Sequence, residues 1–339
     1  MNRIDVFVRR QRIKNLENWT IRAILAEAFF LPIFPSLAAA AIMFGITFWF
    51  FRLQIDTKFK IRSLPFDIPV SIFIMLGAIS VFNSPARNFE LIYNYCAIGG
   101  VYGLTYLLVG QNIRTAEQIK DLAKVLAASA VIVALGGYFQ YIFGIDLAEM
   151  TWADGELHPE LRKHVFSTME NPNVLAGYLD VIICLALGFL AKFGSRREKF
   201  ILLGAIIFFA ACLAMTHSHG AFLSLAIIFL FYGFLQDWRF LTLLALIIGI
   251  VYYNDANFFE KVMEIFTAPN DFSEIPRTAI WVSTISMIAD HPFVGIGWGA
   301  YEILYPQYNY YLTNSAAPIN HAHNLYLQTA AEIGIAGAL

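Results

Sequence analysis

The chain alternates between long apolar segments and short polar ones. Apolar runs of roughly 15 residues or more occupy residues 24–51, 68–82, 91–110, 125–144, 173–191, 200–216, 220–235 and 241–253. A helix needs about 20 residues to cross a bilayer, and it satisfies its own backbone polar groups there. We therefore predict an all-α polytopic membrane protein with about 9–10 transmembrane helices.

The last apolar run begins at Leu325 and reaches Leu339. A helix does not end in mid-bilayer with open carbonyl groups, so we expect a fragment of a longer protein that lacks its carboxy-terminal spans. This pattern gives three parts within one integrated domain. Residues 1–253 form a transmembrane helical bundle, residues 254–324 a large loop between the last two spans, and residues 325–339 the start of a truncated transmembrane helix.

Basic residues are distributed unevenly between alternate loops. Segments 52–67, 111–124, 192–199 and 236–240 hold 12 Lys or Arg in 43 residues, whereas segments 83–90, 145–172, 217–219 and 254–324 hold 5 in 110. The positive-inside rule places the first set in the cytoplasm. The second set is then extracytoplasmic, and it contains all seven histidines of the chain.

The amino-terminal region allows two topologies. Residues 1–22 carry six basic residues, which favours a cytoplasmic amino terminus. The run 24–51 must then cross the membrane twice, and Pro32 and Pro35 would break it into a short hairpin. A single span with the amino terminus outside is the alternative.

The composition supports a membrane protein and excludes other classes. Hydrophobic residues make up 58% of the chain and charged residues 14%, whereas about a quarter of the residues of a globular protein are charged. The net charge is −2 and no basic cluster is interleaved with aromatic residues, which argues against nucleic-acid binding. The three cysteines lie inside apolar runs without disulfide or zinc spacing.

The large loop contains the densest polar motifs. Arg277 and Trp281 are four residues apart in an amphipathic pattern that predicts a surface helix, closed by Asp290-His291-Pro292. A glycine turn follows, in which the backbone would approach a ligand closely; its glycines are Gly295, Gly297 and Gly299.

Three further polar points accompany this segment. The HAHN sequence places His321 and His323 at the mouth of the last apolar run, THSHG forms a tight turn at 216–220, and Asn171-Pro172-Asn173 predicts a turn that caps the next helix. Ionisable groups at the edge of a membrane are candidates for function.

These blocks resemble the O-antigen ligase and O-antigen polymerase superfamily of membrane glycosyltransferases. The similar sequences are STMENPNVLAGYL at 167–179, THSHGAFLSL at 216–225 and, between 277 and 334, RTAIW, DHPFVGIGWGAY and HAHNLYLQTAAEIG. They follow the family's order and cover roughly half of the chain. The last block is the most specific.

The resemblance implies glycan transfer at the outer face of the bacterial cytoplasmic (inner) membrane. The donor would be a glycan on a polyprenyl diphosphate, and the acceptor a hydroxyl of a glycan, lipid or protein. The essential histidine of the family, directly before an asparagine, maps onto His323. The arginine upstream of a tryptophan maps onto Arg277, and a second arginine, in an S-R-G turn, is replaced by His219.

The chemistry of these residues agrees with such roles. An imidazole that titrates near neutrality suits a general base, typically worth about 10²–10⁴-fold in rate, and a guanidinium matches two phosphate oxygens. His219 would bind phosphate only when protonated. No D-x-D pair in the outer loops offers a metal site, so we expect a metal-independent mechanism without a cofactor. Further expected substrate contacts are His321, Asn324, Asn173 and Trp281.

Each assignment has a structural alternative. His323 would otherwise cap the last helix or, with His321, hold a metal ion. Arg277 would otherwise anchor its helix at the membrane interface, and the THSHG histidines would form a polar turn. At the level of the whole chain, the alternatives are a bicarbonate-uptake-like membrane transporter and a non-catalytic polysaccharide-assembly protein. The sequence does not separate ligase from polymerase.

Overall fold

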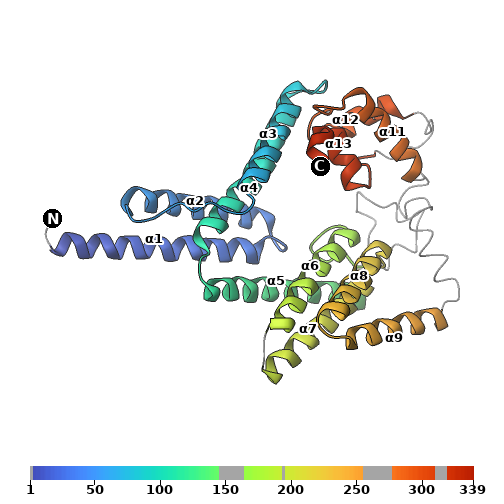
Figure 1. Cartoon of the computed structure of the whole chain (residues 1–339), viewed down its shortest axis with the longest axis horizontal. Helices are drawn as coiled ribbons and strands as arrows, with labels where there is room; N and C mark the ends of the chain where they lie inside the picture. Colours follow the sequence, from blue (N-terminus) through green and yellow to red (C-terminus); the bar gives the residue numbers. More distant parts are fainter. Residues whose placement is uncertain (1–2, 145–163, 193–194, 255–276, 310–318) are drawn as a thin grey trace. The chain divides into compact units, whose positions relative to one another are not determined.

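The computed structural model describes residues 3–144, 164–192, 195–254, 277–309 and 319–339, and every regular element in these ranges is helical (Figure 1). The elements are α1 (Arg3–Phe30), α2 (Pro35–Ile55), α3 (Asp67–Asn83), α4 (Phe89–Asn112), α5 (Ala116–Phe143), α6 (Pro172–Lys192), α7 (Arg196–Ala214), α8 (His219–Leu235), α9 (Arg239–Asn254), α11 (Arg277–Asp290), α12 (Tyr301–Leu304), the 3₁₀ helix η2 (Tyr305–Tyr308), α13 (Leu325–Ile333) and α14 (Ile335–Ala338). The predicted all-α class is confirmed.

The predicted apolar runs coincide with helices. Within the described part of the chain, α2, α4, α5 and α6 are long and apolar enough to cross a membrane, and shorter apolar helices occupy Asp67–Asn83, Gly220–Leu235 and Thr278–Asp290. The chain is thus a multi-pass membrane protein. The full number of spans and the side on which each loop lies stay predictions.

The run 24–51 is split between its two prolines. Helix α1 ends at Phe30 and α2 begins at Pro35, because proline removes an amide hydrogen and cannot continue the preceding helix. The two helices fold back on each other, and Arg52 of α2 forms an ion pair with Glu17 of α1 at 3.2 Å. A helical hairpin therefore forms, as one of the two topologies requires; that both helices cross the bilayer stays a prediction.

Contacts divide the chain into two compact units. The first comprises residues 1–24, 42–114 and 267–339, and the second comprises residues 25–41 and 115–266. The core of the first unit includes Val81, Leu91, Ile280, Met287, Tyr301 and Ala331. The core of the second unit includes Ala134, Leu179, Ile183, Phe209 and Leu213. The described helices of the large loop thus pack with α3 and α4, whereas the predicted boundaries at 253 and 324 stay predictions.

The helix predicted from Leu325 begins there as α13 and ends at Ile333. Gly334 adopts φ +83°, and a Cβ at this position would lie 2.2 Å from the carbonyl oxygen of Phe293. Only glycine fits such a position, so the backbone turns before α14. Whether residues 325–339 enter the bilayer stays a prediction.

Candidate functional site

The two histidines of the HAHN sequence are exposed on either side of a buried alanine. Ala322 has 0% exposure, whereas His321 and His323 are both exposed. Their ring centroids lie 4.0 Å apart, with 37° between the ring planes. The segment therefore presents two adjacent imidazoles from a backbone that is packed into the protein.

Two helices hold Ala322 in place. The indole Nε1 of Trp281, on α11, donates to the carbonyl oxygen of Ala322 at 3.0 Å. The amide of Ala322 donates to Oε1 of Gln328, on α13, at 2.7 Å. Both backbone polar groups of this buried residue are thus satisfied. Trp281 thus holds the loop by this hydrogen bond, and its predicted substrate contact stays a prediction.

Asn324 starts α13. Its Oδ1 accepts hydrogen bonds from the amides of Tyr326 at 3.0 Å and Leu327 at 3.2 Å, which is the usual arrangement of an asparagine N-cap. The cap of the last helix is therefore Asn324, and the alternative that assigned this task to His323 is wrong. A substrate contact of Asn324 stays a prediction.

Gln328 also connects the histidine loop to the glycine turn. Its side chain hydrogen-bonds to the carboxylate of Glu332, and this carboxylate also accepts hydrogen bonds from the backbone amides of Gly299 and Tyr301. The amide of Gly297 donates to the carbonyl oxygen of Glu332 at 3.0 Å. Sequence reasoning missed both side chains. Their signal is a pair of polar residues four apart, on one face of an otherwise apolar helix.

The predicted glycine turn serves this packing. Gly295, Gly297 and Gly299 have φ values of +74°, +109° and +81°, which glycine adopts without steric cost. A Cβ at Gly295 would lie 2.4 Å from the backbone of Glu332. The close approach expected for a ligand is therefore made, at Gly295, to the end of α13.

Strained backbone coincides with the sequence blocks. Among the described residues, the non-glycine positions with positive φ are Ser167, Glu170, His217 and His323. All four lie in the three blocks that resemble the membrane glycosyltransferases. Such conformations cost of order 1–3 kcal/mol each and gather at functional sites.

The other two blocks meet within the second unit. Ser218, the residue before α8, donates its hydroxyl to Oδ1 of Asn173 at 2.6 Å. The rings of His164 and His217 stack with centroids 4.9 Å apart. The structure thus joins Asn173, predicted as a substrate contact, to the THSHG turn. His219 is the first residue of α8.

Arg277 is the first residue of α11. Four residues of helix rise by about 6 Å, so its backbone lies one turn before Trp281, on the helix that holds Ala322. An α-helix N-terminus attracts anions, because its first amides are unsatisfied and its dipole is positive there. The helix therefore places Arg277 where a phosphate is favoured.

Desolvation by neighbouring groups lowers the pKa of His321 below its ordinary value of 6.5. The neutral imidazole is thus favoured at neutral pH, and it adds no positive charge beside His323. A neutral histidine nitrogen accepts a proton, as general-base catalysis requires.

Comparison with known proteins finds one family. Residues 203–339 match the family described as O-antigen ligase. No curated protein and no solved structure matches the chain. The matched region contains the THSHG turn, α11, the glycine turn and the HAHN loop. The resemblance found in the sequence is thereby confirmed: residues 203–339 carry an O-antigen ligase domain of the O-antigen ligase and polymerase superfamily.

Proposed function

We propose that this protein transfers a glycan from a polyprenyl diphosphate to an acceptor hydroxyl at the extracytoplasmic face of the bacterial cytoplasmic membrane, with His323 as general base. The family match supports O-antigen ligase-type glycosyl transfer in general. The assignment of His323 as the base rests on the HAHN loop, which exposes His323 while Trp281 and Gln328 hydrogen-bond to the backbone of the neighbouring Ala322. Fixed orientation of a reacting group is a large source of rate enhancement.

In the proposed reaction, an imidazole nitrogen of His323 takes the proton of the acceptor hydroxyl. The oxygen attacks the anomeric carbon of the donor and forms the new glycosidic bond. The bond from that carbon to the diphosphate oxygen breaks, and polyprenyl diphosphate leaves with the electron pair. A single displacement of this kind inverts the configuration at the anomeric carbon.

Arg277 is proposed to bind the diphosphate as its negative charge grows. Its planar guanidinium offers two parallel donors to phosphate oxygens, and the start of α11 adds a positive helix end. His219 and Asn173 are proposed as further substrate contacts, together with His321. The proposal needs no metal ion for acceptor activation, since an imidazole supplies the base.

Replacement of His323 by alanine tests the proposal. We expect glycan transfer to fall by about 10²–10⁴-fold, measured in membranes as the ratio of transferred to lipid-linked glycan. The matched control is His291→Ala, which removes another histidine of the large loop, at the end of α11, and should leave transfer unchanged. Transfer at the wild-type level in a membrane-inserted His323→Ala variant would remove the proposed base.

A further inference from the structure

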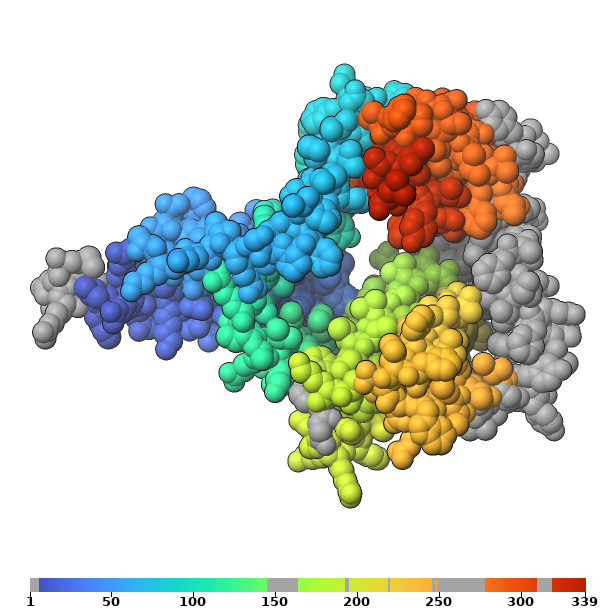
Figure 2. Space-filling view, in the orientation of Figure 1, coloured from blue at the N-terminus to red at the C-terminus, as the bar shows by residue number. Residues whose placement is uncertain are grey.

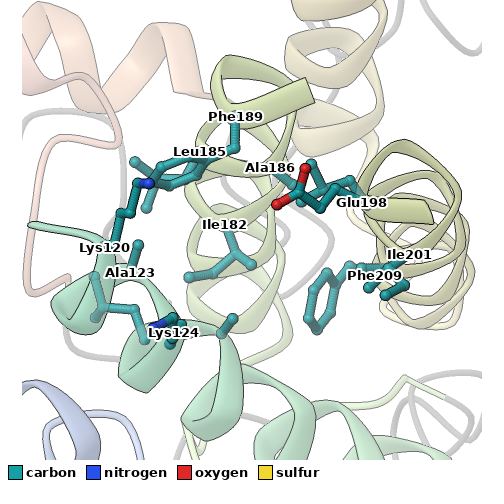
Figure 3. A pocket seen from close by; sticks show the side chains of 14 residues that line it. Lys120, Ala123, Lys124, Ile182, Leu185, Ala186, Phe189, Glu198, Ile201 and Phe209 are labelled. Atoms are coloured by element: carbon teal, nitrogen blue, oxygen red, sulfur yellow. The ribbon is translucent and has the colours of Figure 1, made fainter. Parts of the chain in front are cut away.

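A cavity of about 570 Å³ lies between α5, α6 and α7 in the second unit (Figure 3). Its wall is formed by residues 120–127 of α5, residues 182–189 of α6 and residues 198–209 of α7. These are the beginning of α5, the later half of α6 and the beginning of α7. The cavity therefore lies toward the end of the helices that carries segments 111–124 and 192–199. Its volume lies within the range of about 300–1,000 Å³ typical of ligand sites.

Most of the cavity wall is apolar, and its charged side chains lie at one end. Ile182, Leu185 and Phe189 of α6 face it together with Ile201 and Leu202 of α7. In Figure 3, Lys120 extends from α5 toward α6, and the Glu198 carboxylate reaches from α7 toward Ala186. Two lysines and one glutamate thus stand at the charged end of an apolar slot, and an apolar slot with an excess of cationic side chains at its mouth matches an acyl chain that ends in an anionic head group.

The charge around this mouth is positive. Segments 117–124 and 192–199 contain six basic residues and three acidic ones, which leaves +3. Lys124 and Asp121 pair at 2.8 Å, but their side chains are 74% and 48% exposed, so this pair contributes little fixed structure. Glu198 accepts a hydrogen bond from the Ser195 hydroxyl at the start of α7, and its negative charge is included in this sum.

Two helix N-termini lie at the same end. Thr115 caps α5 and Ser195 caps α7, so the positive dipole ends of both helices lie at the end of the cavity that Lys120 and Lys124 line. The negative end of α6, at Lys192, lies there as well. Helix N-termini favour phosphate groups. The apolar wall and the excess of basic side chains, with two helix N-termini against one C-terminus, thus favour one amphipathic anion.

We propose that this cavity binds an anionic phospholipid, with an acyl chain between α6 and α7 and the phosphate near Lys120 and Lys124. Segments 111–124 and 192–199 are the basic loops predicted to face the cytoplasm, so the lipid comes from the cytoplasmic leaflet. A site of this kind is independent of the proposed glycosyl transfer. It anchors the starts of α5 and α7 to the lipid head groups.

The test is lipid retention by the full chain reconstituted in vesicles of equal parts phosphatidylglycerol and phosphatidylcholine. The protein is re-extracted in mild detergent, and the co-purified lipids are counted by mass spectrometry. We expect wild type to retain phosphatidylglycerol preferentially. The preference should fall by about fivefold for each lysine removed in the variants Lys120→Gln and Lys124→Gln. The matched control removes Lys58 and Lys60, which are exposed in the loop before α3.

A second variant tests the acyl part of the site. Ala186→Phe narrows the cavity, and we expect it to reduce retention of phosphatidylglycerol while the head-group lysines are intact. Equal retention of the two lipids by wild type would overturn the proposal. The same holds for unchanged retention in the lysine variants, or for an equal loss in the Lys58/Lys60 control, since either result makes the cavity irrelevant to binding. Retained polyprenyl diphosphate in place of phosphatidylglycerol would likewise overturn the assignment of the lipid.

Discussion

The hydrogen bond between Trp281 and Ala322 makes a quantitative prediction about the histidine loop. Trp281→Phe keeps an aromatic ring between α11 and the loop but removes the indole donor, which lies 3.0 Å from the carbonyl oxygen of Ala322. Ala322 is fully buried, so water does not replace the lost donor. An unsatisfied buried carbonyl costs about 1–3 kcal/mol. If the variant destabilises the native conformation of the histidine loop by this free energy, relative to its other conformations, transfer falls by up to about 5–150-fold.

The assay is glycan transfer in membranes that contain the lipid-linked donor, with protein amount and thermal unfolding measured in parallel. The control is Trp49→Phe, because the buried Nε1 of Trp49 has no hydrogen-bond partner among the described residues. The two variants delete the same atoms, but only Trp281→Phe removes a hydrogen bond to the loop. Wild-type transfer by Trp281→Phe, or an equal loss in both variants, would refute the positioning role. A loss confined to Trp281 shows that the loop must be held for reaction.

The remaining predictions concern charge at the same segment. Arg277→Ala should raise the donor concentration needed for half-maximal transfer by about 10–100-fold, which corresponds to the loss of a hydrogen bond to a charged group. Arg277→Lys should restore part of the affinity for the donor. A lower maximal rate with an unchanged half-maximal donor concentration would contradict diphosphate binding. His321 has a lowered pKa, so the unfolded state binds its proton more readily. Stability should therefore decrease as pH falls below about 6.5, and His321→Gln should weaken this dependence in thermal unfolding; an unchanged dependence would show that other groups cause it.

Much of the fold follows from the apolar pattern. The run predicted at 68–82 is helix α3, Asp67–Asn83, and the end of α11 falls at Asp290, where Asp-His-Pro predicted it. The pattern does not predict the polar part of α1, because residues 3–22 contain no long apolar run. Residues 3–22 are nevertheless helical, and the ion pair of Glu17 with Arg52 on α2 contributes to their contacts.

The site was less predictable than the helices. The spacing of Trp281 from Arg277 indicates a common helix face, but its hydrogen bond to Ala322 spans 41 residues of sequence, and local periodicity does not predict such a contact. The glycine turn was expected to approach a ligand, whereas Gly295 packs on Glu332. That packing depends on how two segments meet in space, which the positive φ of a glycine permits but does not specify.

The spacing of the HAHN block follows from the geometry of α13. Asn324, Gln328 and Glu332 are four apart, so about 100° of rotation per residue brings them to one face of the helix. From that face Asn324 caps the helix, Gln328 reaches back to the amide of Ala322, and Glu332 accepts the amides of the glycine turn. One residue added before Gln328 would turn it by about 100° away from Ala322. The number of residues between Ala322 and Gln328 therefore helps to determine the position of the backbone that carries the two imidazoles.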